Sequence, residues 1–127
     1  MKTYVVDTQA LAWFISRDRQ LGRRARAVLR DPSVRIIVPA IVLAEIKYLV
    51  HKGRLAQTLD DVLRVINSDP RCIIYPVDLS VILAAPVDLD IYESLIVGTA
   101  LVQREIVDGI LTRNKAIIAS GLVPTVW

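Results

Sequence analysis

The chain has 127 residues, of which 54% are hydrophobic and 6% aromatic, and a formal net charge of +3 at pH 7. This length suits one domain with a substantial core, and no apolar run reaches the roughly 18 residues that a membrane span needs. The lone Cys72 excludes an internal disulfide and no signal-peptide pattern is present, so we expect a single cytoplasmic domain over residues 1–127.

Short β-branched runs alternate with longer helical patterns along the whole chain. We expect strands at 3–6, 35–38, 72–77, 107–111 and 124–127. We expect helices at 9–16, 20–30, 39–51, 55–67, 91–104 and 114–120, with a short helix between Asp78 and Pro86. Alternating strands and helices favour an α/β fold with right-handed crossovers. The sequence therefore predicts a three-layer αβα sandwich of Rossmann-like character around a central, mostly parallel five-stranded sheet.

The first predicted strand ends in an acid. The run Tyr4-Val5-Val6 is followed by Asp7 and Thr8, and a helix pattern begins directly afterwards. Ligands of open parallel sheets bind just beyond the carboxyl ends of the strands, so Asp7 stands where a metal ion or a phosphate would be handled. Asp is also a common helix N-cap, and on this segment alone the cap is the commoner role.

Arginines gather in the second helical stretch. Twelve of the sixteen basic residues are arginines. Six of them lie close together: Arg17, Arg19, Arg23, Arg24, Arg26 and Arg30. They form either the solvated face of an amphipathic helix or a surface that contacts a nucleic-acid backbone or an acidic partner.

Glu45 falls within the apolar arc of the helix predicted over 39–51, because Ile41 and Leu49 stand four residues to either side. Burying an unpaired charge costs several kcal/mol, so this carboxylate needs a base, hydrogen-bond donors or a cation. The structural alternatives are an internal ion pair, for example with an arginine, and a side chain that reaches the rim.

Glu93 shows the same pattern near the start of the helix predicted over 91–104. Ile96 and Val97 lie three and four residues further on, so the acid points toward packed structure. The structural alternative is a capping box, in which Asp90 caps the helix and Glu93 reaches back to it.

Asp7, Glu45 and Glu93 are all expected near one edge of the sheet. Hard divalent cations take oxygen ligands with no fixed spacing along the sequence, so three such acids would make a site for Mg²⁺ or Mn²⁺. The sequence has no cluster of cysteine and histidine, which argues against zinc, and we expect the only histidine, His51, to be a surface or packing residue.

The order and spacing of several segments resemble the PIN-domain ribonucleases, and most closely the small VapC-type toxins of toxin–antitoxin pairs. The segments are Tyr4-Val5-Val6-Asp7-Thr8, Ala44-Glu45-Ile46 with Lys52-Gly53-Arg54-Leu55, Glu93-Ser94-Leu95-Ile96-Val97-Gly98-Thr99-Ala100, and Leu111-Thr112-Arg113-Asn114-Lys115-Ala116-Ile117. Gly121 before Pro124-Thr125-Val126-Trp127 matches the usual ending. The resemblance covers essentially the whole chain.

This resemblance implies a metal-dependent ribonuclease that hydrolyses RNA phosphodiester bonds with Mg²⁺ or Mn²⁺. It also implies the toxin of a type II toxin–antitoxin pair, with a cognate antitoxin as partner and a homodimer as the assembly. Asp7 would be the central metal ligand, Glu45 would order water at the metal, and Glu93 would complete the ligand set.

The resemblance implies further roles around these acids. Thr8 and Thr112 would be hydroxyls that fix the geometry of the ligands. Contacts to the RNA backbone would come from Lys47, Arg54, Arg113 and Lys115.

Two positions depart from the usual pattern of the family. The third acidic position usually carries Asp followed by Arg, and here it is Glu93-Ser94. The fourth usually carries Asp, and here it is Asn114, whose amide oxygen can bind a hard cation but adds no charge. We therefore expect weaker metal binding than in a full quartet. The second hypothesis is a PIN-like RNA- or protein-binding module whose catalysis is weakened or lost.

Two other enzyme and signalling classes begin with an acid-ended strand. Phosphatases of the haloacid dehalogenase class need a second Asp two residues later, where this chain has Gln9. Receiver domains are disfavoured because the predicted strand before Asp78 does not end in their usual phosphoacceptor setting.

Overall fold

The computed structural model describes all residues 1–127. The strands are β1 (Thr3–Val6), β2 (Arg35–Pro39), β3 (Cys72–Tyr75), β4 (Gly109–Leu111) and β5 (Thr125–Val126). The helices are α1 (Thr8–Ser16), α2 (Arg23–Arg30), α3 (Ala40–His51), α4 (Leu59–Asn67), α5 (Leu79–Ala84), α6 (Ile91–Leu101) and α7 (Lys115–Ser120). Every expected strand and helix is present, which confirms the α/β prediction.

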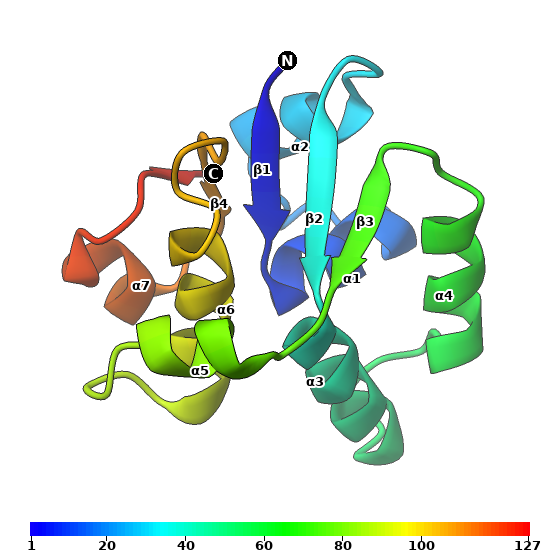
Figure 1. Cartoon of the computed structure of the whole chain (residues 1–127). Coiled ribbons are helices and arrows are strands. Elements are labelled where there is room, and N and C mark those ends of the chain that lie inside the picture. The colour runs from blue at the N-terminus through cyan, green and yellow to red at the C-terminus, as the bar shows by residue number, and fades with distance from the viewer.

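The five strands form one sheet in the order β3-β2-β1-β4-β5. Every pair is parallel, so the sheet is fully parallel and not only mostly so. In the register, Tyr4 of the central strand stands between Ile36 of β2 and Gly109 of β4. Figure 1 shows the arrows of β1, β2 and β3 pointing the same way.

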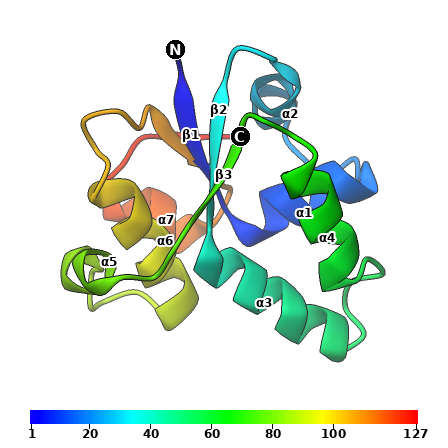
Figure 2. The ribbon, with the colours of Figure 1, turned by 45° about the vertical axis from the view of Figure 1, so that its right-hand side comes forward.

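Helices cover both faces of the sheet. Figure 2 shows α1, α2 and α4 on one side of the strands and α5, α6 and α7 on the other, with α3 beyond the carboxyl end of β2. This arrangement confirms the predicted three-layer αβα sandwich. The aliphatic composition follows from it, because parallel strands covered on both faces are buried on both.

The core lies along the three central strands. Val5 and Val6 of β1 and Ile110 and Leu111 of β4 have no exposed surface. Ile37 of β2 is almost as deeply buried, and 22 buried residues form one continuous hydrophobic cluster. No helix is long and apolar enough to cross a bilayer.

Several predicted boundaries were wrong by a few residues, and caps or proline explain three of them. The helix expected from residue 20 begins at Arg23, after Gly22 as N-cap. The helix expected from residue 55 begins at Leu59, because Thr58 and Asp61 form a reciprocal capping box. The strand expected to reach residue 77 ends at Tyr75, directly before Pro76, which has no N–H to donate. The helix expected to reach residue 104 ends at Leu101.

The carboxyl ends of the central strands are followed at once by helix starts. Asp7 after β1 is the N-cap of α1, and Pro39 at the end of β2 is the N-cap of α3. Asn114, three residues after β4, is the N-cap of α7. The fold therefore collects the first turns of three helices at one edge of the sheet.

Candidate active site

A pocket of about 290 Å³ lies at this edge of the sheet, and it contains every acid singled out from the sequence. Its lining comes from the starts of α1, α6 and α7, from α3 and from the loop that follows α3. The lining residues are Asp7, Thr8, Gln9, Glu45, Leu49, Arg54, Asp90, Tyr92, Glu93, Ile96, Asn114 and Ile117. The structure thus brings Asp7, Glu45, Glu93 and Asn114 together around one cavity.

Asp7 is both a helix cap and a wall of the pocket. Its Oδ1 accepts a hydrogen bond from the backbone N–H of Ala10 at 2.8 Å, and the residue is only 6% exposed. The pKa of Asp7 is raised from 3.8 to about 6, because burial and, to a smaller extent, the charge of Glu45 outweigh the lowering by Thr112, Ala10 and Arg113. No cation of the protein forms a salt bridge with this carboxylate.

Glu45 is half-buried and faces Asp7 from α3. The hydroxyl of Thr8 donates a hydrogen bond to Oε1 of Glu45. The internal ion pair considered from the sequence does not form, because none of the three salt bridges involves Glu45. The carboxylate of Glu45 accepts from the Thr8 hydroxyl and otherwise faces the pocket.

Glu93 enters the pocket from the first turn of α6. Asp90 caps this helix by accepting from the backbone N–H of Glu93 at 2.9 Å, as the capping alternative expected. The carboxylate of Glu93 does not reach back to the cap, so the capping box is absent. Instead Oε1 of Glu93 accepts from the side-chain Nδ2 of Asn114 at 2.6 Å.

Thr112 lies behind the acids and contacts Asp7 and the backbone of Asn114. Its side chain is fully buried, and its Oγ1 accepts from the backbone N–H of Asn114 at 3.0 Å. A hydrogen bond from the same hydroxyl lowers the pKa of Asp7. Thr8 and Thr112 therefore lie where supporting hydroxyls were expected, each beside one acid.

The four predicted RNA-contacting residues lie in different settings. Arg54 lines the pocket. The guanidinium of Arg113 lies over the ring of Trp13 at 4.6 Å and over that of Trp127 at 5.8 Å, close enough to Asp7 to lower its pKa. Lys47 and Lys115 are exposed and do not line the pocket.

Gln9 and Tyr92 also line the pocket, although neither was predicted as a site residue. Gln9 lies two residues after Asp7 in the first turn of α1, and Tyr92 directly precedes Glu93 in the first turn of α6. Because the first turns of these helices meet at the pocket, polar residues next to Asp7 and Glu93 were the signal that could have found them.

The oxygen atoms around the pocket are suitable ligands for a hard divalent cation. They are carboxylate, amide and hydroxyl oxygens, and the acids lack ion-pair partners. No three acidic, histidine or cysteine side chains converge tightly enough to hold a metal ion directly as they stand. A cation bound here would therefore keep several of its own waters, as Mg²⁺ commonly does in proteins.

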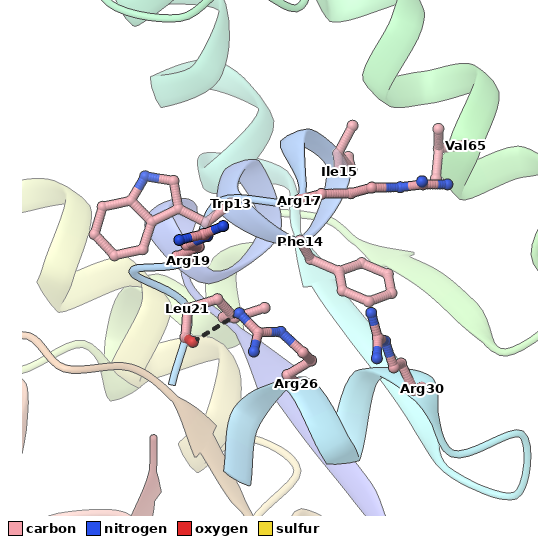
Figure 3. A pocket seen from close by; sticks show the side chains of 9 residues that line it. All are labelled: Trp13, Phe14, Ile15, Arg17, Arg19, Leu21, Arg26, Arg30 and Val65. Carbon is pink, nitrogen blue, oxygen red and sulfur yellow. Dashed lines mark hydrogen bonds between the residues drawn. The ribbon is translucent and has the colours of Figure 1, made fainter. Parts of the chain in front are cut away.

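A second, larger hollow of about 700 Å³ is lined by residues of α1, the turn after it, α2 and α4. Figure 3 shows its apolar side chains, which are Trp13, Phe14, Ile15, Leu21 and Val65, and its arginines, which are Arg17, Arg19, Arg26 and Arg30. We call these nine residues the arginine groove. Arg26 is committed to the carbonyls of Asp18 and Leu21, whereas the other three form no salt bridge. Four of the six clustered arginines thus surround one hollow.

Comparisons with known proteins show which proteins this chain is similar to. The sequence profile of the PIN domain matches residues 4–117. The VapBC2 structure from Rickettsia felis, bound to a DNA fragment from their promoter, is similar with a TM-score of 0.67 and 15% identity over 98% of this chain and 97% of that one. The sarcin-ricin loop cleaving toxin VapC20 of Mycobacterium tuberculosis is similar with a TM-score of 0.64 and 12% identity over 94% and 96%. No curated protein matches the sequence.

Proposed function

Because this chain belongs to the PIN domain family, we propose that it is a ribonuclease that hydrolyses RNA phosphodiester bonds with Mg²⁺ or Mn²⁺. We further propose that it is the toxin of a type II toxin–antitoxin pair. The observation that carries the proposal is a single pocket lined by Asp7, Glu45 and Glu93, none of which forms a salt bridge in the protein.

Each of these pocket residues would have a separate role in such a reaction. Asp7 and Glu93 would hold the cation, which would lower the pKa of a water and offset charge on the phosphate. Glu45, oriented by the hydroxyl of Thr8, would accept a proton from the attacking water. Arg54 at the wall of the pocket would contact a phosphate oxygen of the RNA.

The proposed protein partner is an antitoxin, and the arginine groove supports it. One structural neighbour is a VapBC2 complex. The groove combines apolar and aromatic side chains with Arg17, Arg19 and Arg30, which have no acidic partner of their own. A partner segment with acidic residues beside apolar ones would satisfy both kinds of surface.

The proposed assembly is a homodimer formed through α5 and its flanks. Large apolar side chains are exposed there: Leu79 at 69%, Leu83 at 77%, Val87 at 99% and Ile91 at 64%. Apolar patches of this kind mark interaction surfaces, and a second copy would cover them.

The function is tested with purified protein, RNA and Mn²⁺. We expect cleavage that is lost on addition of EDTA and that falls about 10²–10⁴-fold in Glu45→Gln, the range for loss of a general base. Glu105→Gln is the matched control, because Glu105 is exposed and lies outside the pocket. Cleavage by Glu45→Gln at the rate of the unchanged protein would contradict the assignment.

A second candidate is a binding module without catalysis, which the uncharged Asn114 at the fourth position favours. RNA binding without metal-dependent cleavage in the same assay would select this alternative.

A further inference from the structure

We propose that Asn114 is a positioning residue that holds Glu93 through its amide N–H while its amide oxygen caps α7, and that it is not a metal ligand. Only the part of this inference that concerns metal binding rests on the proposed function. It replaces the expectation that the amide oxygen of Asn114 faces the cation.

The orientation of the Asn114 amide is fixed by its partners. Oδ1 accepts from the backbone N–H of Ile117 at 3.0 Å, and a backbone N–H can only donate. Nδ2, which can only donate, therefore points to Oε1 of Glu93 at 2.6 Å. Turning the amide over would place two donors against each other at Ile117 and two acceptors against each other at Glu93.

The amide oxygen has a structural task on α7, which fixes its direction. Asn114 is the N-cap of α7, a helix of only six residues. If Oδ1 turned to a cation, the N–H of Ile117 would lose its acceptor, although Ile117 is buried. An amide oxygen has two lone pairs, so the cap does not by itself bar a cation; it directs Oδ1 toward α7, and turning the oxygen toward a cation would give up this hydrogen bond.

The amide also avoids a conflict that a carboxylate would create. An aspartate at position 114 would place a second negative charge about as near to Glu93 as the amide nitrogen now lies, and two carboxylates at that distance cannot both ionise without a cation. With asparagine the contact is favourable in the absence of metal.

Asn114 thereby links two acids of the pocket. Its side chain holds Glu93, and its backbone N–H donates to Thr112, whose hydroxyl contacts Asp7. Glu45 is held separately by Thr8. Each of the three carboxylates therefore has a donor that orients it before any cation binds.

The first test follows hydrogen exchange at the backbone amide of Ile117, with EDTA and with saturating Mg²⁺. We expect Mg²⁺ to leave this exchange unchanged or to slow it, because Oδ1 stays on α7. Exchange that becomes tenfold faster at Ile117 with Mg²⁺ would show that the oxygen leaves the cap for the metal, and would overturn the proposal.

The second test is a double-mutant cycle in EDTA with Asn114→Ser, Glu93→Ala and the double variant. Serine keeps an N-cap acceptor and removes the amide donor, so the cycle isolates the contact with Glu93. We expect the loss in urea midpoint caused by Asn114→Ser to shrink clearly once Glu93 is absent. Strictly additive losses would overturn the proposal.

A charge variant adds a metal-dependent readout. We expect Asn114→Asp to lower the melting temperature in EDTA and to bind Mn²⁺ at least tenfold more tightly in calorimetry than the unchanged protein. Asn67→Asp makes the same charge change at an exposed site on α4 and should do neither. An Asn114→Asp variant as stable in EDTA as the unchanged protein would contradict the proposal.

These outcomes separate the two proposals. If no variant binds Mn²⁺, the proposed function fails, while the cycle in EDTA still reports the contact between Asn114 and Glu93. If Mn²⁺ binds normally but the cycle is additive, the positioning role alone fails.

Discussion

The buried carboxylate of Asp7 destabilises the folded state when it is ionised. Its pKa is about 6 in the folded chain against 3.8 as the reference, chiefly because it is buried. The folded state therefore binds the proton more tightly than the unfolded state. The resulting stabilisation is fully present below about pH 3.8 and is lost as pH rises through about 6, a change of roughly 3 kcal/mol for a shift of this size.

We predict that Asp7→Asn stabilises the metal-free protein at pH 7.5. Asparagine keeps the acceptor that caps α1 and removes the buried charge, so up to roughly 3 kcal/mol is regained. Thermal unfolding in EDTA from pH 4 to pH 8 measures it, and the fall in melting temperature between pH 4 and pH 6 should flatten. Asp60→Asn, at an exposed site, is the control. A less stable Asp7→Asn protein at pH 7.5 would contradict the argument.

The acids of the pocket could be found from the sequence, whereas the direction of the Asn114 amide could not. Asp7, Glu45 and Glu93 stand out because charge within apolar surroundings demands a reason. The Asn114 amide is set by Glu93, twenty-one positions earlier, and by the N–H of Ile117. The helix expected over 114–120 begins at Lys115, and Asn114 is its N-cap.

At the scale of elements, the close packing of α5 on α6 positions the helix that carries Glu93. A Cβ added at Gly98 would lie 2.7 Å from the carbonyl oxygen of Val81 and 3.1 Å from Cα of Ala85. Ser94 is buried on the same helix, and its hydroxyl donates to the carbonyl of Pro86. Small residues on α6 therefore let α5 approach closely.

We predict that Gly98→Ala destabilises the protein although alanine favours helices. The propensity gain is about 1 kcal/mol, and overpacking against backbone costs roughly 1–3 kcal/mol. Urea unfolding should show a net loss of about 1 kcal/mol, and Gly98→Val should lose more. Equal or greater stability of Gly98→Ala would mean that α5 moves away without cost.

The elements themselves were predictable because periodic apolar patterns and caps are local. The arginine groove was not, since it depends on how the turn after α1 orients α2. Arg17 ends α1 with a φ of 58°, in the left-handed region, and Val65 reaches the groove from α4. The sequence alone could not distinguish such a groove from a solvated arginine face.

At the scale of the whole molecule, alternation of strands and helices dictates parallel pairing and two covering layers. The strand order places β1 at the centre, so the acid after it comes to lie among the starts of α6 and α7 and the side of α3. The pattern along the chain does not predict which apolar side chains stay exposed. Leu83 and Val87 are ordinary apolar positions in the sequence, and both are exposed in the folded chain.

We predict that the chain is a dimer of twice 14.2 kDa in solution, and that Leu83→Glu makes it monomeric. A charge in the middle of the exposed apolar patch around α5 would be buried without a partner in the dimer, at a cost of several kcal/mol, but would be solvated in the monomer. Light scattering after size exclusion measures the mass at several protein concentrations. Val65→Glu introduces the same charge on α4, in the opposite layer, and should leave the dimer intact. A monomeric unchanged protein would contradict the dimer, and dissociation by Val65→Glu alone would place the interface on α4 instead of α5.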